Sequence, residues 1–109
     1  MYEVKAGIRE IDNISVETFK REIVNANLLE VEAGTTGYKG GDSGHGCRTY
    51  IRIEDLGDTN IRVAAIKSSK RGNGGMVIEL GGDSELSTII AGLKFITKVL
   101  EDQVNEVYN

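Results

Sequence analysis

The last quarter of the chain carries the apolar pattern that most constrains the fold. Between residues 86 and 107, apolar side chains recur at spacings of three and four, which places them on one broad face of an α-helix. The members of this stripe are Leu86, Ile89, Ile90, Leu93, Ile96, Val99, Leu100, Val104 and Val107. The stripe extends about 30 Å at 1.5 Å per residue, so we expect part of it to contact a second protomer.

The residues around this stripe define the ends and one special position of the predicted helix. Asp83 or Ser84 suits an N-cap, and we predict a helix over residues 85–107. Gly92 lies within the stripe. It either permits a close approach of the helix to its neighbour or costs about 1 kcal/mol relative to alanine.

Shorter patterns precede the helix. Leu29, Val31 and Ala33 alternate with Glu30 and Glu32, which is typical of a half-buried strand. Similar patterns predict strands over residues 48–54, 60–67 and 76–80, and a strand or extended arm over residues 4–11. Val16, Phe19, Ile23 and Ala26 have helical spacing, so a short helix is predicted over residues 16–26.

These elements predict one α+β domain over residues 1–109. The short linker over residues 56–59 suggests that the strands at 48–54 and 60–67 form an antiparallel hairpin, and residues 76–80 should pair with the preceding strand. We therefore expect an antiparallel sheet of about four to five strands, with a short N-terminal helix and a long C-terminal amphipathic helix.

Composition and charge exclude several classes of protein. No apolar run approaches the roughly 20 residues of a membrane span, and no secretory signal is evident, so we expect a cytoplasmic protein that does not enter membranes. The single cysteine, Cys47, cannot form an internal disulfide. The net charge is −4, yet residues 34–75 carry seven basic and four acidic side chains between acidic flanks. An electropositive middle segment favours a compact anion site.

The most unusual segment of that middle region is rich in glycine. Residues 34–46 contain six glycines in thirteen positions, together with the hydroxyls of Thr35, Thr36 and Ser43. Glycine permits positive φ and close backbone approach, so successive amides can converge on an anion. The alternative is a compact surface loop without a ligand. The second glycine-containing loop, residues 68–75, has two adjacent cations and is interpreted as a solvated hairpin tip, with closure over a bound anion as the alternative.

The strand after the loop gives a second indication of an anion site. If Thr49, Ile51 and Ile53 point to the core, then Arg48, Tyr50 and Arg52 share the opposite face, and Arg62 joins them from the next strand. Guanidinium groups around an aromatic ring suit the phosphates and base of a nucleotide. The alternative is an ordinary solvated face with Glu54 and Asp55 as ion-pair partners. The predicted ligand-binding residues are Tyr38, Lys39, Gly41, Ser43, Gly44, His45, Arg48, Tyr50, Arg52 and Arg62.

Catalytic and metal sites receive less support from the sequence. The string Gly41-Asp42-Ser43-Gly44 matches the nucleophile region of chymotrypsin-like proteases, but the only histidine, His45, lies two residues from the serine, so that interpretation is rejected. His45 has few partners for a metal, and no metal or cofactor is predicted. Nucleophilic catalysis by Cys47 with His45 as its base remains an alternative.

The segment from Gly40 to Tyr50, the chain's size and the order of sheet and helix together resemble the phage anti-Thoeris sponge proteins. Those proteins capture cyclic ADP-ribose isomers made by bacterial TIR-domain defence enzymes. The resemblance implies a fold and a ligand class and assigns no residue a role. It also implies a homodimer or higher oligomer that sequesters its ligand without cleaving it, with pockets where protomers meet.

Three functions therefore remain as hypotheses. The first is a phage anti-defence sponge that sequesters a cyclic nucleotide, a cyclic ADP-ribose isomer or cyclic dinucleotide, in the host cytoplasm. The second is a small single-stranded nucleic-acid-binding protein that uses the same cations on a polymer backbone. The third is a small enzyme that uses His45, Asp42 or Cys47.

Overall fold

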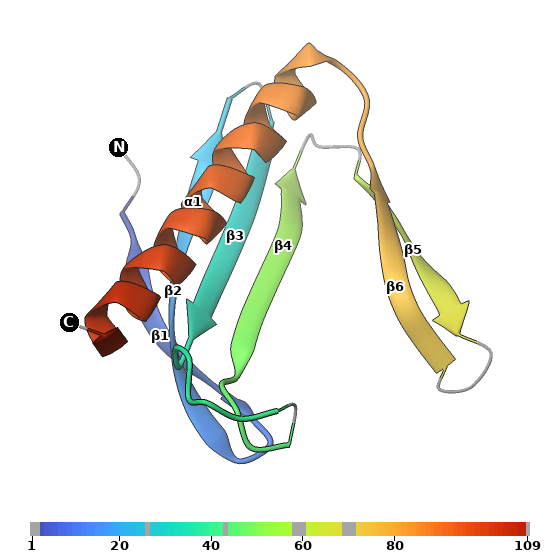
Figure 1. Ribbon diagram of the computed structural model, residues 1–109. Coiled ribbons are helices and arrows are strands. Elements are labelled where there is room, and N and C mark those ends of the chain that lie inside the picture. The colour runs from blue at the N-terminus through green and yellow to red at the C-terminus, as the bar shows by residue number, and fades with distance from the viewer. Residues whose placement is uncertain (1–2, 26, 43, 58–60, 69–71, 109) are drawn as a thin grey trace.

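The chain forms one antiparallel sheet with a helix on one face, and a separate hairpin stands beside it (Figure 1). The structure is a computed structural model that describes residues 3–25, 27–42, 44–57, 61–68 and 72–108. The elements are β1 (Lys5–Ile11), β2 (Ile14–Val24), β3 (Leu28–Thr35), β4 (Thr49–Gly57), β5 (Arg62–Ser68), β6 (Gly72–Glu79) and α1 (Asp83–Tyr108). The main sheet has the order β1-β2-β3-β4, and β5 pairs with β6. The predicted α+β class and the long C-terminal helix are confirmed.

The predicted N-terminal helix over residues 16–26 is wrong. The segment forms β2, which pairs with β1 on one side and β3 on the other. Val16 lies on one face of this strand, and Phe19 and Ile23 lie on the other. Because apolar residues occur on both faces, their spacing along the chain resembles that of a helix. Asp12 and Asn13 have φ values of 53° and 66°, as a two-residue turn of type I′ requires. This turn joins β1 to β2.

The predicted hairpin between residues 48–54 and 60–67 is also wrong. β4 pairs with β3, with Ile51 opposite Ala33, and β5 pairs with β6 in a second sheet. The predicted pairing of residues 76–80 with the preceding strand is confirmed. Among the described strands, none pairs with the outer edge of β4.

Helix α1 packs mainly over β3 and β2, where the hydrophobic core lies (Figure 1). The buried core residues are Ile23, Leu29, Val31, Ala33, Ile96 and Val99. Gly92 is buried against β3, where an added Cβ would lie 3.1 Å from Val31 Cγ1. The glycine in the stripe therefore permits a close approach of helix to sheet.

Polar contacts fix α1 at both ends. The hydroxyl of Thr88 donates to Asn27 Oδ1 over 2.7 Å near the start of the helix. Near its end, Gln103 accepts from the amide of Thr35 and donates to the carbonyl of Glu17, each over 2.8 Å. The amide of Leu86 donates to the carbonyl of Gly82, so Gly82 rather than Asp83 or Ser84 occupies the N-cap.

The hairpin of β5 and β6 extends away from the main sheet (Figure 1). The radius of gyration is 15.4 Å, whereas a compact domain of 100 residues has one of about 13 Å. Most apolar side chains described in the hairpin are exposed, including Val63, Ile66, Met76 and Val77. A two-stranded hairpin by itself is marginally stable in water, so this arm lacks the packing that usually supports such an element.

The contact at Gly92 gives a direct test of the helix position. Gly92→Leu should lower the free energy of unfolding by about 1 to 3 kcal/mol, because the new side chain must displace Val31 or lift the helix. Urea denaturation measures the change. The matched control is Ala91→Leu at the exposed neighbouring position, which should stay within about 0.5 kcal/mol of the wild type. Equal losses in the two variants would place the helix elsewhere.

Candidate functional site

The glycine-rich segment forms a closed loop between β3 and β4. Its two ends are joined because the amide of Thr36 donates to the carbonyl of Arg48, and the amide of Arg48 donates to Thr36 Oγ1, both over 3.0 Å. The hydroxyls of Thr35 and Thr49 lie 2.9 Å apart just below this junction. Gly37 and Gly40 have positive φ values of 80° and 76°. The loop is thus anchored at its base rather than loosely attached.

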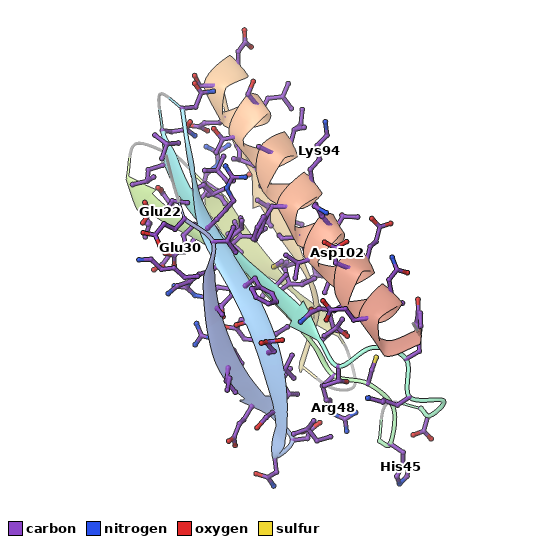
Figure 2. All side chains as sticks on the ribbon, turned by 90° about the vertical axis from the view of Figure 1, so that its left-hand side faces the viewer. Glu22, Glu30, His45, Arg48, Lys94 and Asp102 are labelled. Atoms are coloured by element: carbon purple, nitrogen blue, oxygen red, sulfur yellow. The ribbon has the colours of Figure 1, made fainter. Side chains whose placement is uncertain are left out.

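Arg48 holds the loop from inside and is 8% exposed. Its guanidinium donates to the carbonyls of Gly44, Gly46 and Cys47 over 3.0 to 3.2 Å, and Nε donates to Asp12 Oδ2 over 2.9 Å. Figure 2 shows Arg48 at the base of the loop and His45 at its outer turn. Arg48 therefore differs from the expectation of a solvent-facing position, since its donors already have acceptors within the chain.

Asp42 occupies the convergent amides of the loop. Its Oδ1 accepts from the amides of Gly44 and His45 over 2.9 and 3.1 Å and lies 3.2 Å from His45 Nδ1. The amide of Gly44, followed by the His45 contacts, lowers the pKa of the Asp42 carboxyl below its usual value. The anion that these amides surround is the loop's own carboxylate.

Two glycines of the loop are required by contacts of the loop with itself. An added Cβ on Gly41 would lie 2.8 Å from the amide nitrogen of Gly46, and one on Gly46 would lie 2.7 Å from the carbonyl oxygen of Gly41. Such distances are shorter than any real Cβ contact, so neither position accepts a side chain without movement of the loop. Gly44 has more space, because the nearest atom to its Cβ would be Asp42 Oδ1 at 3.5 Å.

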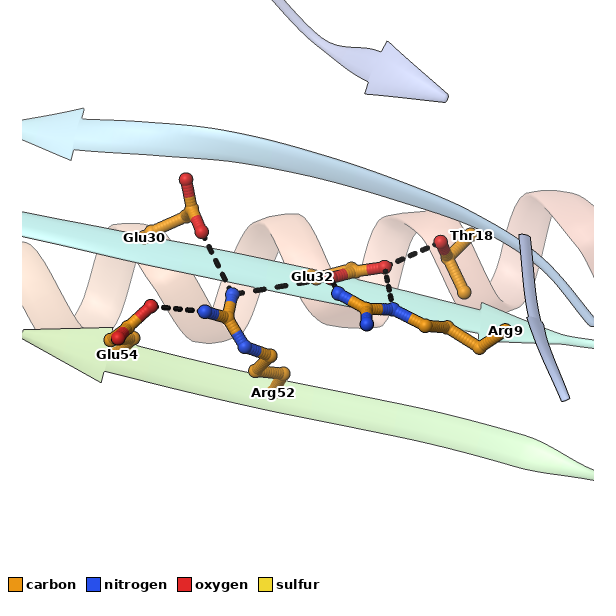
Figure 3. A network of polar contacts seen from close by, with 6 residues as sticks. All are labelled: Arg9, Thr18, Glu30, Glu32, Arg52 and Glu54. Carbon is orange, nitrogen blue, oxygen red and sulfur yellow. Dashed lines mark hydrogen bonds and ion pairs between the residues drawn. The ribbon is translucent and has the colours of Figure 1, made fainter. Parts of the chain in front are cut away.

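The face of the main sheet away from α1, here called the polar face, carries an ion-pair network (Figure 3). Arg9 donates twice to Glu32, over 3.0 and 2.7 Å, and Thr18 Oγ1 donates to the same carboxylate over 2.6 Å. Arg52 contacts Glu30 over 2.8 Å and also pairs with Glu54. Glu32 is nearly inaccessible, with its side chain 3% exposed.

Hydrogen bonds shift the titration of the groups in this network. The bond from Arg9 lowers the pKa of Glu32, burial opposes the shift, and the bond from Thr18 adds to it. The hydrogen bond from Arg52 to Glu30 raises the pKa of Arg52. The hydrogen bond from Arg9 to Glu32 likewise raises the pKa of Arg9. These arginines neutralise carboxylates of the sheet.

The predicted site residues are divided among three places. Tyr38, Lys39, Gly41, Gly44 and His45 belong to the loop, and Ser43 lies outside the described residues. Tyr50 and Arg52 do share one face, as the strand pattern predicts, but Arg9 lies over the Tyr50 ring at 5.1 Å from its centroid.

Arg62 does not join that face, because it lies on β5 and pairs with Glu79 over 3.3 Å. The expectation that Arg62 adjoins Arg52 from the next strand is therefore wrong. Its physical reason is the pairing of β5 with β6 instead of β4.

Two adjoining hollows lie between the loop and the C-terminal half of α1, and we call them together the Tyr38 hollow. The inner one has a volume of about 160 Å³ and is lined by Thr35, Gly37, Tyr38, Cys47, Thr49, Leu100 and Val104. The outer one, about 420 Å³, shares Tyr38, Leu100 and Val104 and adds Glu101, Asp102 and Asn105. The sequence did not indicate Leu100 and Val104 as residues of a site, because in the sequence they are recognisable only as members of the apolar stripe of the helix.

No protein-family model, curated protein or solved structure matches the chain. Within the described ranges, no group of His, Cys, Asp or Glu side chains is arranged to hold a metal ion. No helix in that part of the chain is long and apolar enough to cross a membrane.

Arg48 is expected to act as a structural residue of the loop. Arg48→Ala should lower the free energy of unfolding by about 2 to 3 kcal/mol, because several buried and half-buried charge-assisted hydrogen bonds are lost. The control is Arg62→Ala, whose exposed ion pair should contribute less than about 1 kcal/mol. Denaturant unfolding and amide exchange of residues 44–47 measure both effects. An Arg48→Ala protein with wild-type stability would contradict this role.

The lowered pKa of Glu32 predicts a dependence of stability on acidity. A carboxylate with a depressed folded-state pKa stabilises the fold above its unfolded pKa, 4.5, and this stabilisation is lost as the pH falls through the folded pKa. Stability should therefore decrease below about pH 4.5, and the decrease should be shallower in Glu32→Gln, which has no carboxyl to protonate at this position. Urea unfolding from pH 7 to pH 2 measures both slopes. Identical slopes would show that Glu32 does not titrate as described.

Proposed function

We propose that the chain is a non-catalytic binding protein that sequesters a small anionic nucleotide, a cyclic ADP-ribose isomer or cyclic dinucleotide. On this proposal it is a phage anti-defence sponge that acts in the host cytoplasm as a homodimer or higher oligomer. The observation that carries the proposal is the Tyr38 hollow, where an exposed aromatic ring adjoins an apolar wall and two threonine hydroxyls.

The lining of the hollow suits a nucleoside. Tyr38 is 63% exposed, and its ring offers a stacking surface for a base. Leu100 and Val104 form the apolar wall across from the loop. The hydroxyls of Thr35 and Thr49 lie at the inner end, where the polar edge of a base can form hydrogen bonds. In the outer hollow, Glu101 and Asp102 can accept hydrogen bonds from ribose hydroxyls, as acidic residues do in dinucleotide-binding folds.

The phosphates of such a ligand need cations that the hollow itself lacks. Lys39 is next to Tyr38 and exposed, but Arg48 and Arg52 already have partners within the chain. The hairpin region over residues 61–80 carries four basic and one acidic side chains, whereas residues 83–108 carry two basic and five acidic ones. A basic hairpin from a second copy would therefore complement the acidic helix and complete the anion site.

Exposed apolar surface supports the same assembly. The hairpin exposes apolar residues on both faces, and the helix exposes Leu86, Ile90 and Leu93. The outer edge of β4 pairs with no other strand that the structure describes. Ile51 of β4, on the helix side of the sheet, is 53% exposed. Surfaces of this kind usually mark an interface, and an unpaired strand edge is a template for another chain.

Native mass spectrometry of the protein with added cyclic ADP-ribose or cyclic di-GMP tests the proposal. We expect a dimer or larger species that retains one of these nucleotides and returns it chemically intact on denaturation. Tyr38→Ala should weaken binding roughly fivefold to a hundredfold through lost stacking, and Tyr38→Phe should retain it. Met76→Glu on the hairpin should give monomers, whereas Ser87→Glu, at an exposed helix position outside the face of Leu86, Ile90 and Leu93, should not.

Three outcomes would contradict the proposal in different ways. Recovery of a hydrolysed ligand would indicate an enzyme. Preference for single-stranded oligonucleotides, with affinity that falls steeply as salt rises, would indicate a nucleic-acid-binding protein. A monomer that binds none of these compounds would exclude the sponge altogether.

A further inference from the structure

A separate hollow of about 400 Å³ lies on the other flank of α1, between the C-terminal half of the helix, β2 and Val4. We call it the Arg21 hollow. Phe19 on β2 and Phe95 on α1 contribute aromatic surface, and Arg21 and Lys98 contribute positive charge. Its volume is in the range of small-molecule sites, which are mostly apolar with a few well-placed polar groups. It shares only Asp102 with the lining of the Tyr38 hollow.

Arg21 differs from the other arginines of the main sheet. Arg9 and Arg52 pair with carboxylates, and Arg48 with Asp12 and backbone carbonyls. The Arg21 guanidinium instead lies 5.9 Å from the centroid of the Phe95 ring. Its Nε is buried and has no hydrogen-bond partner in the described part of the chain. A buried donor without an acceptor is unfavourable, and a turn of the guanidinium toward a ligand's acceptor in the hollow relieves that cost.

The surrounding charges limit what the acceptor can be. Lys98 is paired with Asp102 over 3.0 Å. Among the described residues, no carboxylate forms a salt bridge with Arg21, so Arg21 is the unpaired cation in the described lining of the hollow. Glu106 also lines the hollow, so a group with several negative charges would be repelled. A single carboxylate matches the forked donors of one guanidinium.

We propose that the Arg21 hollow binds a small aromatic carboxylic acid. The carboxylate accepts hydrogen bonds from the Arg21 guanidinium, and the flat ring lies between Phe19 and Phe95, where aromatic rings favour offset or edge-to-face contacts. This site uses none of the residues of the glycine-rich loop. It shares only Asp102 with the hollow of the proposed nucleotide function, and its test does not depend on that function.

The test uses indole-3-acetate as the probe and the full-length chain labelled with ¹⁵N. We expect saturable binding, with a shift of the Arg21 Nε–H resonance at saturation. Arg21→Ala should weaken binding roughly tenfold to a hundredfold. The matched control is Lys20→Ala, which removes the neighbouring cation on the polar face and should change affinity less than twofold. Indole, which has the ring without the carboxylate, should bind at least tenfold more weakly.

Several results would overturn the site. They are an unshifted Arg21 Nε–H resonance at saturating probe, equal affinity for indole, or equal weakening by Lys20→Ala, which would indicate non-specific charge attraction. Phe95→Leu gives a second variant that removes the stacking surface and keeps the guanidinium. This variant should bind the probe at least fivefold more weakly and should still show a cooperative unfolding transition. Unchanged affinity for the probe would exclude the stacked geometry.

Discussion

The packing of one helix on a four-stranded sheet determines most of what this molecule exposes. A helix with its side chains is about 10 to 12 Å wide, and neighbouring strands lie about 4.8 Å apart, so one helix covers the middle of the sheet and leaves both sides open. Here Gly92 lets α1 approach β3 closely, which fixes the helix over the centre. The open side along β4 exposes Ile51, and the open side along β2 forms the Arg21 hollow. Both surfaces follow from the position of the helix on the sheet.

The charges of the main sheet are arranged by burial. Glu32 is nearly inaccessible and stays ionised because Arg9 and Thr18 supply its hydrogen bonds, and Arg52 serves Glu30 and Glu54 in the same way. Arginines in this sequence are therefore a poor guide to phosphate contacts, since most of them satisfy partners in their own chain. The informative cation is Arg21, whose buried Nε has no partner within the described residues.

Apolar periodicity in the sequence predicted most of the elements, and it failed for residues 16–26 and for the pairing of the strands. The stripe of α1, the alternation around Val31 and the shorter patterns at residues 48–54, 60–67 and 76–80 all correspond to elements of the predicted type. β2 was missed because it buries both faces, and the turn at Asp12 and Asn13 was the signal that could have identified it. The partner of β4 could not be predicted, because pairing depends on contacts distant in sequence. For the same reason, Arg62 was predicted beside Arg52 on the main sheet, whereas it lies in the hairpin of β5 and β6.

The glycine-rich loop shows why glycine content alone does not define a ligand site. Gly41 and Gly46 lie where the loop crosses itself, Asp42 fills the convergent amides, and Arg48 ties the carbonyls to the sheet. The amides and the guanidinium group from which an anion site was inferred are thus mostly engaged within the loop. Their contacts give the loop a defined shape. A defined loop presents Tyr38 beside Leu100 and Val104, residues of the helix that lie more than sixty positions away in the sequence. Any selectivity of that hollow therefore depends on where α1 lies on β3 as much as on the loop itself.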